Sequence, residues 1–222
     1  MRTLTITRVV HASVLVDFDG SAILTDPWYS ERSGYYPGEP VGIPLKALPR
    51  LVGVVVSHRH YDHYDMDAFA AYPDKSVPFA VKRGTAVPAL TAGFRTVMEL
   101  DPWETVSLGG VKVTAAPAKH GVPENTYILE AAGFTVFLSG DTLLIPELDE
   151  VARRFPHVSP CRKLETRRGR TGAMMPKANM SSRTVTKMKP SAARRLVSMR
   201  PLFSPPVAGT CHPDPLELVH QP

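Results

Sequence analysis

Cysteine and long apolar stretches are both scarce in this chain of 222 residues. Its two cysteines, Cys161 and Cys211, cannot build a disulfide framework, and because neither lies in a Cys-x-x-Cys pair, a cysteine-built zinc site is not expected. No stretch approaches the roughly 18 uninterrupted apolar residues of a membrane span. The first residues alternate polar and apolar side chains and lack the continuous apolar core of a secretory signal. The sequence therefore predicts a cytoplasmic protein without a membrane span.

Several sequence motifs of enzyme active sites are missing as well. The chain contains no Gly-x-Ser-x-Gly nucleophile motif, no Gly-rich phosphate-binding loop and no dinucleotide-binding fingerprint. It also offers no convincing Ser-His or Cys-His pair. These absences argue against the common nucleophilic hydrolases and against nucleotide-binding enzymes.

Aromatic residues nearly disappear after residue 158. Residues 159–222 contain one aromatic residue, Phe203, together with nine prolines and five of the eight methionines. They hold 12 Lys/Arg against 3 Asp/Glu, a net charge of +9, whereas residues 1–158 hold 14 against 18, a net charge of −4. This change divides the chain into a domain at residues 1–158 and a basic, Pro- and Met-rich tail at 159–222, which we expect to be disordered.

Two other interpretations of the tail are open. Its Arg, Pro and Ser bias is typical of a GC-rich gene translated out of frame, and translation of the other two frames beyond codon 158 would test this. Alternatively, the tail is an authentic basic segment that binds nucleic acid through salt-sensitive phosphate contacts. A single aromatic residue offers no platform for stacking bases, so nucleic acid is the less favoured partner.

Short apolar or alternating runs in residues 1–158 predict many strands and few helices. Expected strands cover residues 3–10, 13–18, 22–25, 51–57, 77–81, 95–99, 104–108, 111–115, 126–130 and 135–138, and expected helices cover 65–71, 84–92 and 146–155. The run 51–56 is apolar throughout, which is typical of a strand buried on both faces. Residues 28–50 show no clear period, so we expect a long loop that borders a functional site.

A cluster of metal-ligand residue types follows this apolar run: His58, His60, Asp62 and His63. His58 and His60 are two residues apart in an extended segment, so their side chains point the same way and can reach one metal ion. Asp62 and His63 come where the chain turns, and they can face a second ion. Neutral imidazoles and carboxylates suit Zn²⁺, and also Mn²⁺ or Fe²⁺. A lone histidine is most often an ordinary residue, but this grouping indicates a metal site.

Two further residues come just after expected strands. His120 follows the strand at 111–115, and Asp141 follows the strand at 135–138. In a layered α/β fold, ligands and catalytic groups collect at such strand ends. Taken alone, His120 could be a plain histidine and Asp141 an ordinary turn aspartate, so neither pattern is decisive by itself.

The motif His58-x-His60-x-Asp62-His63 resembles the signature of the metallo-β-lactamase superfamily. The segments Thr25-Asp26-Pro27-Trp28, Ser57 through Asp65, Glu99 through Glu104 and Ser139-Gly140-Asp141-Thr142 are similar to one branch of it. That branch includes N-acyl-phosphatidylethanolamine phospholipase D and the ascorbate-6-phosphate lactonases. The resemblance covers roughly residues 3–158, in the family's order.

The resemblance implies an α+β or α/β fold, a four-layer αββα sandwich with a two-metal site at one edge of its two sheets. It implies His58, His60 and His120 as ligands of the first metal, Asp62 and His63 as ligands of the second, and Asp141 as the bridge. Asp26 would be a supporting residue that orients the site loops, and a plain Asp-Pro turn is an equal alternative. His11 is expected to be structural rather than a ligand.

The expected function is that of a zinc-dependent hydrolase with two ions. Two adjacent cations lower the pKa of a bridging water, so hydroxide is available near neutral pH, and they stabilise the charge that develops on a carbonyl or phosphoryl oxygen. Asp62 would additionally orient the nucleophile as a catalytic residue. Ester, phosphodiester, lactone and amide substrates, small or lipid-like, all fit, and the sequence does not select among them.

The chain departs from the family in its last third. The family fold continues with a second half that supplies a last histidine ligand after a short apolar strand. His212 and His220 are the only histidines in residues 159–222, and neither follows such a strand. We therefore expect a sandwich that is incomplete in its second half. A catalytically impaired, metal-binding remnant is the alternative to an active hydrolase.

Overall fold

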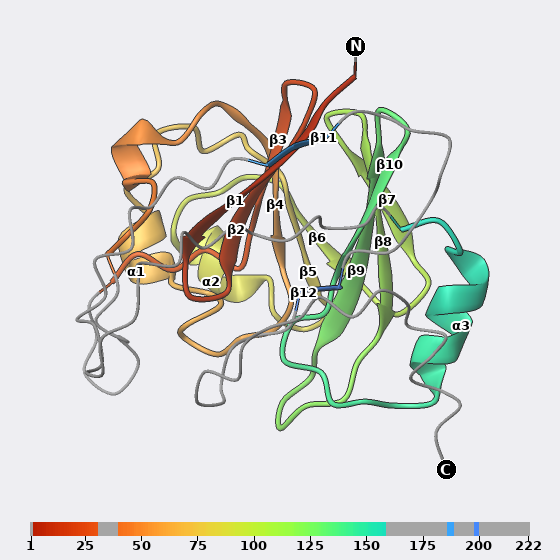
Figure 1. Cartoon of the computed structure of the whole chain (residues 1–222). Coiled ribbons are helices and arrows are strands. Elements are labelled where there is room, and N and C mark those ends of the chain that lie inside the picture. The colour runs from red at the N-terminus through yellow and green to blue at the C-terminus, as the bar shows by residue number, and fades with distance from the viewer. Residues whose placement is uncertain (1, 31–39, 159–185, 189–197, 200–222) are drawn as a thin grey trace, which may run out of the picture.

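Two β-sheets form the centre of the computed structural model, which describes residues 2–30, 40–158, 186–188 and 198–199 (Figure 1). The larger sheet contains β1 (Leu4–Val10), β2 (Ser13–Phe18), β3 (Ser21–Thr25), β4 (Leu51–Val56), β5 (Phe79–Lys82), β6 (Val97–Leu100) and β11 (Thr186–Met188). The smaller sheet contains β7 (Thr105–Leu108), β8 (Val111–Pro117), β9 (Asn125–Ala131), β10 (Phe134–Leu138) and β12 (Ser198–Met199). The strand orders are β11-β1-β2-β3-β4-β5-β6 and β12-β10-β9-β8-β7.

The larger sheet changes from antiparallel to parallel pairing at β3. β1, β2 and β3 pair antiparallel, and β3, β4, β5 and β6 pair parallel. Asp19 and Gly20 connect β2 to β3 with positive φ angles of 55° and 98°, as a two-residue hairpin requires. Because β3 and β4 run the same way, their carboxyl ends lie at one edge of the sheet, which is where ligands collect in such folds. Asp26 and Ser57 follow these two ends directly.

The inner faces of the two sheets pack on each other. Their shared core contains apolar side chains from both sheets, among them Leu4, Ile6, Val16, Phe18, Ile23, Val55, Leu108, Val113, Leu129 and Val136. Gly53 on β4 lets the sheets approach closely, because a Cβ there would lie 2.8 Å from Leu108 Cβ and 2.9 Å from Ile23 Cδ1. The two sheets are therefore in direct contact at the centre of β4, the strand that leads into the histidine motif.

Helices cover the two outer faces (Figure 1). They are α1 (Met66–Phe69), α2 (Val87–Thr91) and α3 (Glu147–Arg154). α1 and α2 lie against the larger sheet, where Phe69 packs with Phe79 of β5 in a second core. α3 lies against the smaller sheet, where Val151 packs with Ile128 of β9. The order helix, sheet, sheet, helix confirms the predicted αββα sandwich.

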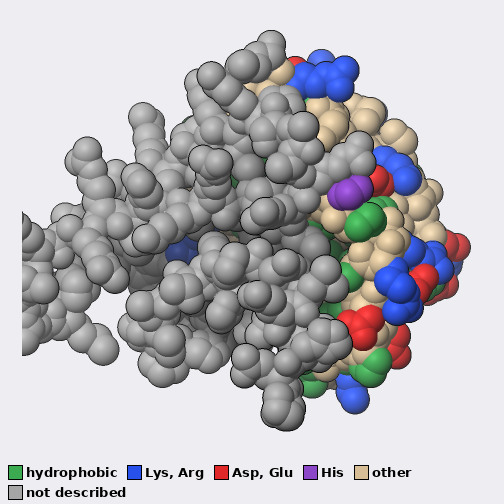
Figure 2. Space-filling view, turned by 45° about the vertical axis from the view of Figure 1, so that its right-hand side comes forward, with side chains coloured by type: hydrophobic (Ala, Val, Ile, Leu, Met, Phe, Trp, Pro, Cys, Tyr) green, Lys and Arg blue, Asp and Glu red, His purple; other side chains and the backbone are tan. Residues whose placement is uncertain are grey.

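The helix α3 carries charges that suit its dipole. Its first turn holds three acidic residues and its last turn holds Arg153 and Arg154, which suits the helix dipole. On its outer side Arg154 Nε donates to Glu150 Oε1 at 2.6 Å. Figure 2 shows Lys/Arg and Asp/Glu side chains interspersed on the described surface that faces the viewer. That visible surface therefore carries no large patch of one sign.

Most predicted elements are present with shifted ends. The strand expected at 51–57 is β4, and the helix expected at 65–71 is the shorter α1, whose N-cap Asp65 accepts the N–H of Ala68. The helix expected at 84–92 begins only at Val87, because Gly84 has a φ of 86° that no α-helix contains. The loop expected at 28–50 includes one turn of 3₁₀-helix, η1 (Leu45–Ala47), and its residues 31–39 lie outside the described residues.

Residues 159–222 fall mostly outside the described part of the chain, and so do His212 and His220. The sequence pattern predicts no strand there, whereas β11 pairs antiparallel with β1 and β12 pairs parallel with β10. Pairing at a sheet edge uses backbone groups, so it leaves little trace in a side-chain pattern. The disordered tail and the incomplete second half stay predictions. Among the described residues, no helix is both long enough and apolar enough to cross a membrane.

Candidate metal centre

The candidate site lies at the edge where the two sheets meet. The chain leaves β4 at Ser57, whose carbonyl oxygen accepts the N–H of Asn125 at the start of β9 with a distance of 3.1 Å. One residue further, His58 forms an isolated antiparallel bridge with Glu124. These contacts join the larger sheet to the smaller one, so side chains from loops of both sheets converge at this edge.

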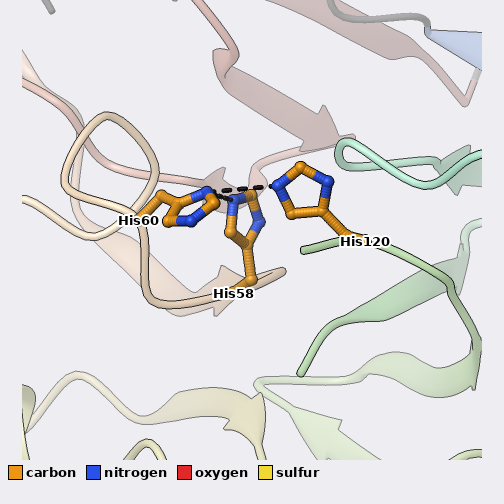
Figure 3. Close-up of side chains that lie close together, drawn as sticks. All are labelled: His58, His60 and His120. Carbon is orange, nitrogen blue, oxygen red and sulfur yellow. Dashed lines mark hydrogen bonds between the residues drawn. The ribbon is translucent and has the colours of Figure 1, made fainter. Parts of the chain in front are cut away.

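Three predicted ligands gather into a first group, His58, His60 and His120 (Figure 3). His58 Nε2 lies 2.9 Å from His60 Nδ1, and His120 Nε2 lies 3.2 Å from the same atom. His58 and His60 come from the segment after β4, and His120 comes from the loop after β8. One ligand atom from each residue lies within 4.8 Å of the others, so the group is compact enough to hold one ion.

The other predicted ligands form two overlapping groups beside the first. One contains His11, Asp62 and His63, and the other contains His58, His63 and Asp141. Asp62 Oδ2 lies 2.9 Å from His11 Nε2 and 3.9 Å from His63 Nε2, and Asp141 Oδ2 lies 3.4 Å from His63 Nε2. The structure thus brings all six predicted ligands together. It adds His11, which contacts the aspartate rather than standing apart from the site.

Asp26 fixes the protonation of two histidines. Its carboxylate accepts the Ser57 N–H at 2.7 Å and the Ser57 hydroxyl proton at 2.9 Å, and it lies 2.9 Å from His63 Nδ1. His63 must therefore carry a proton on Nδ1. Since the Ser57 hydroxyl donates to Asp26, its oxygen can only accept from His58 Nδ1, 2.9 Å away. Both rings are then left with Nε2 directed at the other ligands, an arrangement typical of metal-binding histidines.

The candidate site holds groups of opposite charge close together. Burial lowers the pKa of His63, but the Asp26 and Asp141 carboxylates outweigh burial and raise the pKa to about 10. Burial raises the pKa of Asp141, but contact with His63 lowers it below the usual range, and His11 does the same for the pKa of Asp62. Burial, and then the neighbouring His58 and His120, lower the pKa of His60. Without a metal, a proton on His63 balances the carboxylates.

Two buried atoms test whether these residues fit a metal. His63 Nε2 and Asp141 Oδ1 make no hydrogen bond within the described residues, although Asp141 Oδ2 lies 3.4 Å from the His63 nitrogen. Buried polar atoms are rarely left without partners, because their desolvation is costly. A cation would satisfy both atoms. The imidazole and carboxylate donors suit zinc, iron or manganese, so the residues present fit a metal pair.

Asp65 supports the loop that follows β3. Its Oδ2 accepts the N–H groups of Tyr29 at 2.8 Å and Ser30 at 2.7 Å, and its own N–H donates to Pro27 O at 3.0 Å. The sequence marks Asp65 only as an acidic residue at a helix start. Its contacts with a segment more than thirty residues away depend on the parallel pairing of β3 and β4.

A cavity of about 520 Å³ opens beside the first group. It is lined by Lys82, Pro102, Pro117, Ala118, Lys119, His120, Gly121, Val122, Pro123 and Glu124. His120 belongs both to this lining and to the first histidine group, so a molecule in the cavity would lie next to the candidate metal ligands. The lining is mixed, with Lys82, Lys119, His120 and Glu124 among small and apolar residues, so it offers polar groups that could orient a small molecule.

Known proteins match this chain in sequence. The profile of a family described as "Beta-lactamase superfamily domain" matches residues 21–161. N-acyl-phosphatidylethanolamine-hydrolyzing phospholipase D 1 of Caenorhabditis elegans is 34% identical over 127 residues, which cover 50% of this chain and 36% of that protein. A UPF0173 metal-dependent hydrolase of Anaeromyxobacter sp. is 27% identical over 169 residues, which cover 67% and 59%. The chain thus spans less than two thirds of the length of either relative.

Solved structures share the fold. A possible metal-dependent hydrolase of Veillonella parvula superposes with a TM-score of 0.60 at 22% identity, covering 68% of each chain. CmlA, a diiron β-hydroxylase of Streptomyces venezuelae, superposes with a TM-score of 0.57 at 22% identity, covering 72% of this chain and 33% of that one. At these identities the likeness concerns the fold alone. With the family match over residues 21–161 it confirms the predicted resemblance: the chain belongs to the β-lactamase superfamily and has the metallo-β-lactamase fold.

Proposed function

We propose that this chain is a metal-dependent hydrolase that binds two ions, with zinc as the metal. The observation that carries the proposal is the set of adjacent donor groups around two buried atoms without hydrogen bonds, His63 Nε2 and Asp141 Oδ1. The relative named as a metal-dependent hydrolase supports it. Iron and manganese accept the same ligand types, and one structure of this fold is a diiron protein. The identity of the metal is therefore part of the test.

The proposed ligands are His58, His60 and His120 for the first ion, Asp62 and His63 for the second, and Asp141 between them. Bound ions would supply a water of lowered pKa and would stabilise negative charge on the substrate. The chain's own residues prepare the site. Asp26 keeps the His63 proton on Nδ1, and His11 holds the Asp62 carboxylate at 2.9 Å. Asp62, whose side chain is 12% exposed, would orient the attacking water.

Small-molecule or lipid-like esters, phosphodiesters, lactones and amides are the proposed substrate classes. The cavity beside His120 is large enough for a small substrate, and Lys119 in its lining favours a group with negative charge, whereas Lys82 pairs with Asp101 Oδ1 at 2.7 Å. Leu143, 60% exposed, donates its backbone N–H to Lys119 O at 2.8 Å, so an exposed apolar residue neighbours a residue of the cavity lining. A phosphodiester with an apolar substituent matches both features, and it is the first class to test.

Hydrolysis of chromogenic substrates tests the proposal. Protein loaded with Zn²⁺, Mn²⁺ or Fe²⁺ is mixed with bis(4-nitrophenyl) phosphate, 4-nitrophenyl acetate or an aromatic lactone. We expect activity with at least one substrate, and a loss of at least about 100-fold in kcat/KM for His60→Ala, because charge stabilisation at the reacting centre is removed. His157→Ala is the matched control, since His157 is exposed outside the site and its loss should leave the rate unchanged.

Two outcomes would count against the proposal. A chain that binds metal but hydrolyses none of these substrates would support the alternative of an impaired remnant. Equal activity of His60→Ala and the wild type would contradict the assignment of the site, because His60 Nδ1 contacts Nε2 of both His58 and His120 in the first group.

A further inference from the structure

A buried carboxylate outside the predicted ligand set touches both donor groups. Glu124 lies just before β9, and its side chain is 0% exposed. Its Oε1 lies 3.2 Å from His58 Nδ1 and accepts the backbone N–H of Asp141 at 2.7 Å. A single oxygen atom therefore contacts a histidine of the first group and the peptide that carries the bridging aspartate.

The backbone fixes Glu124 in this place. The bridge between His58 and Glu124, followed by the Asn125 N–H to Ser57 O bond, ties the start of β9 to the end of β4. Gly140 lies beside the Glu124 carboxylate, and a Cβ at Gly140 would collide with Glu124 Oε1. The φ of Gly140 is 53°. Glycine tolerates this conformation and leaves space for the oxygen. The local sequence around Gly140 thus lets the carboxylate reach Asp141.

The charge of Glu124 needs a partner at the site. A buried carboxylate is costly unless opposite charge or hydrogen bonds compensate it. Within the described residues, Glu124 Oε2 has no hydrogen-bond partner. The cations that His58 and Asp141 would bind would offset the negative charge of Glu124. A carboxylate behind a ligating histidine also strengthens that histidine as a ligand.

We propose that Glu124 is a positioning residue that couples the two metal sites. Its Oε1 lies 3.2 Å from His58 Nδ1, the ring atom that donates to the Ser57 hydroxyl oxygen, so its negative charge favours the proton on Nδ1 and would leave Nε2 available for the first ion. It also accepts the N–H of Asp141 and so holds the peptide whose carboxylate would bind the ions. The inference rests on the proposed function, because it concerns the binding of the metals named there.

The affinity for zinc, measured by competition with a chromophoric chelator, tests the inference. Glu124→Gln keeps an acceptor oxygen but removes the charge, and Glu124→Ala removes both. We expect affinity to fall about 10-fold in the first and about 100-fold in the second, the range found for partners of ligating histidines. Glu130→Gln is the matched control on β9, the strand that follows Glu124, because Glu130 pairs with Lys112 Nζ at 2.9 Å near the surface. It should bind zinc as the wild type does.

Two further measurements separate positioning from folding. The urea midpoint of metal-free Glu124→Gln should stay close to that of the metal-free wild type. The visible spectrum of the cobalt-substituted protein should change in Glu124→Ala and return toward the wild type in Glu124→Gln. The inference is overturned if both variants keep the zinc affinity and the cobalt spectrum of the wild type. If Glu124→Ala does not fold, the same result in Glu124→Gln alone overturns it. A wild-type chain that binds no zinc would contradict the proposed function itself.

Discussion

At the scale of single residues, His63 connects the charge of the site to the stability of the protein. Its ring lies 2.9 Å from Asp26 and 3.4 Å from Asp141, and its side chain is fully buried. Burial alone would lower the pKa of His63, but the two carboxylates raise it to about 10. An unfolded histidine has a pKa of about 6.5. The folded metal-free protein therefore binds the His63 proton more tightly than the unfolded chain does.

This difference predicts how the stability of the metal-free protein depends on pH. The contribution of His63 is fully present below about pH 6.5 and is lost as pH rises toward about 10. The pKa values of Asp62 and Asp141 are lowered, so their contributions are present above about pH 4 and are lost as pH falls through the lowered values. Urea unfolding of the metal-free chain should show a falling free energy of unfolding between pH 6.5 and 10.

The matched variant for this measurement is Asp26→Asn, which removes the main partner of the His63 charge. The alkaline decline should be much shallower in this variant than in the wild type. Equal slopes in the two proteins would mean that His63 does not keep its proton in the folded state.

At the scale of elements, β4 both joins the sheets and carries the histidine motif. Gly53 lies at its centre, and a Cβ there would lie within 3 Å of Leu108 and Ile23 from both sheets. We expect Gly53→Ala to lower the free energy of unfolding by about 1–3 kcal/mol, because an added methyl group forces neighbouring side chains from their places. The urea midpoint of the metal-free protein measures this.

Gly121→Ala is the control for this prediction, since a Cβ at Gly121 meets nothing within 4 Å. Its urea midpoint should stay close to that of the wild type. A Gly53→Ala midpoint equal to that of the control would show that the sheets do not pack as tightly at β4 as described.

The elements also show what the sequence could reveal. The apolar run of β4 and the His-x-His-x-Asp-His motif are local, so the strand and most of the proposed ligand set could be predicted from neighbouring residues. The contacts of His11 with Asp62 and of Glu124 with Asp141 join distant segments. They depend on how the sheets pair, and no local pattern encodes them. The proposed role of Glu124 also depends on Gly140, because a Cβ at Gly140 would collide with Glu124 Oε1. In the sequence alone, Gly140 looks like an ordinary turn glycine.

At the scale of the whole molecule, the site is built only when the sandwich is complete at this edge. Its residues come from the turn after β1, the ends of β3 and β4, and the loops after β8 and β10. A metal that binds this assembled site, and not the unfolded chain, stabilises the folded protein. The stabilisation grows with the logarithm of the ratio of the metal concentration to the dissociation constant of the metal. Metal binding and folding should therefore be coupled. The seventh ligand that the family resemblance implies stays a prediction, because His212 and His220 lie outside the described residues.

The most direct test of the two-metal site is a count of metal ions per chain. The purified chain is loaded with excess Zn²⁺ and freed of unbound metal by gel filtration. Its zinc content is then measured by inductively coupled plasma mass spectrometry and divided by the protein concentration. We predict two zinc ions per chain in the wild type and fewer in His60→Ala. One ion or none in the wild type would contradict the two-metal site.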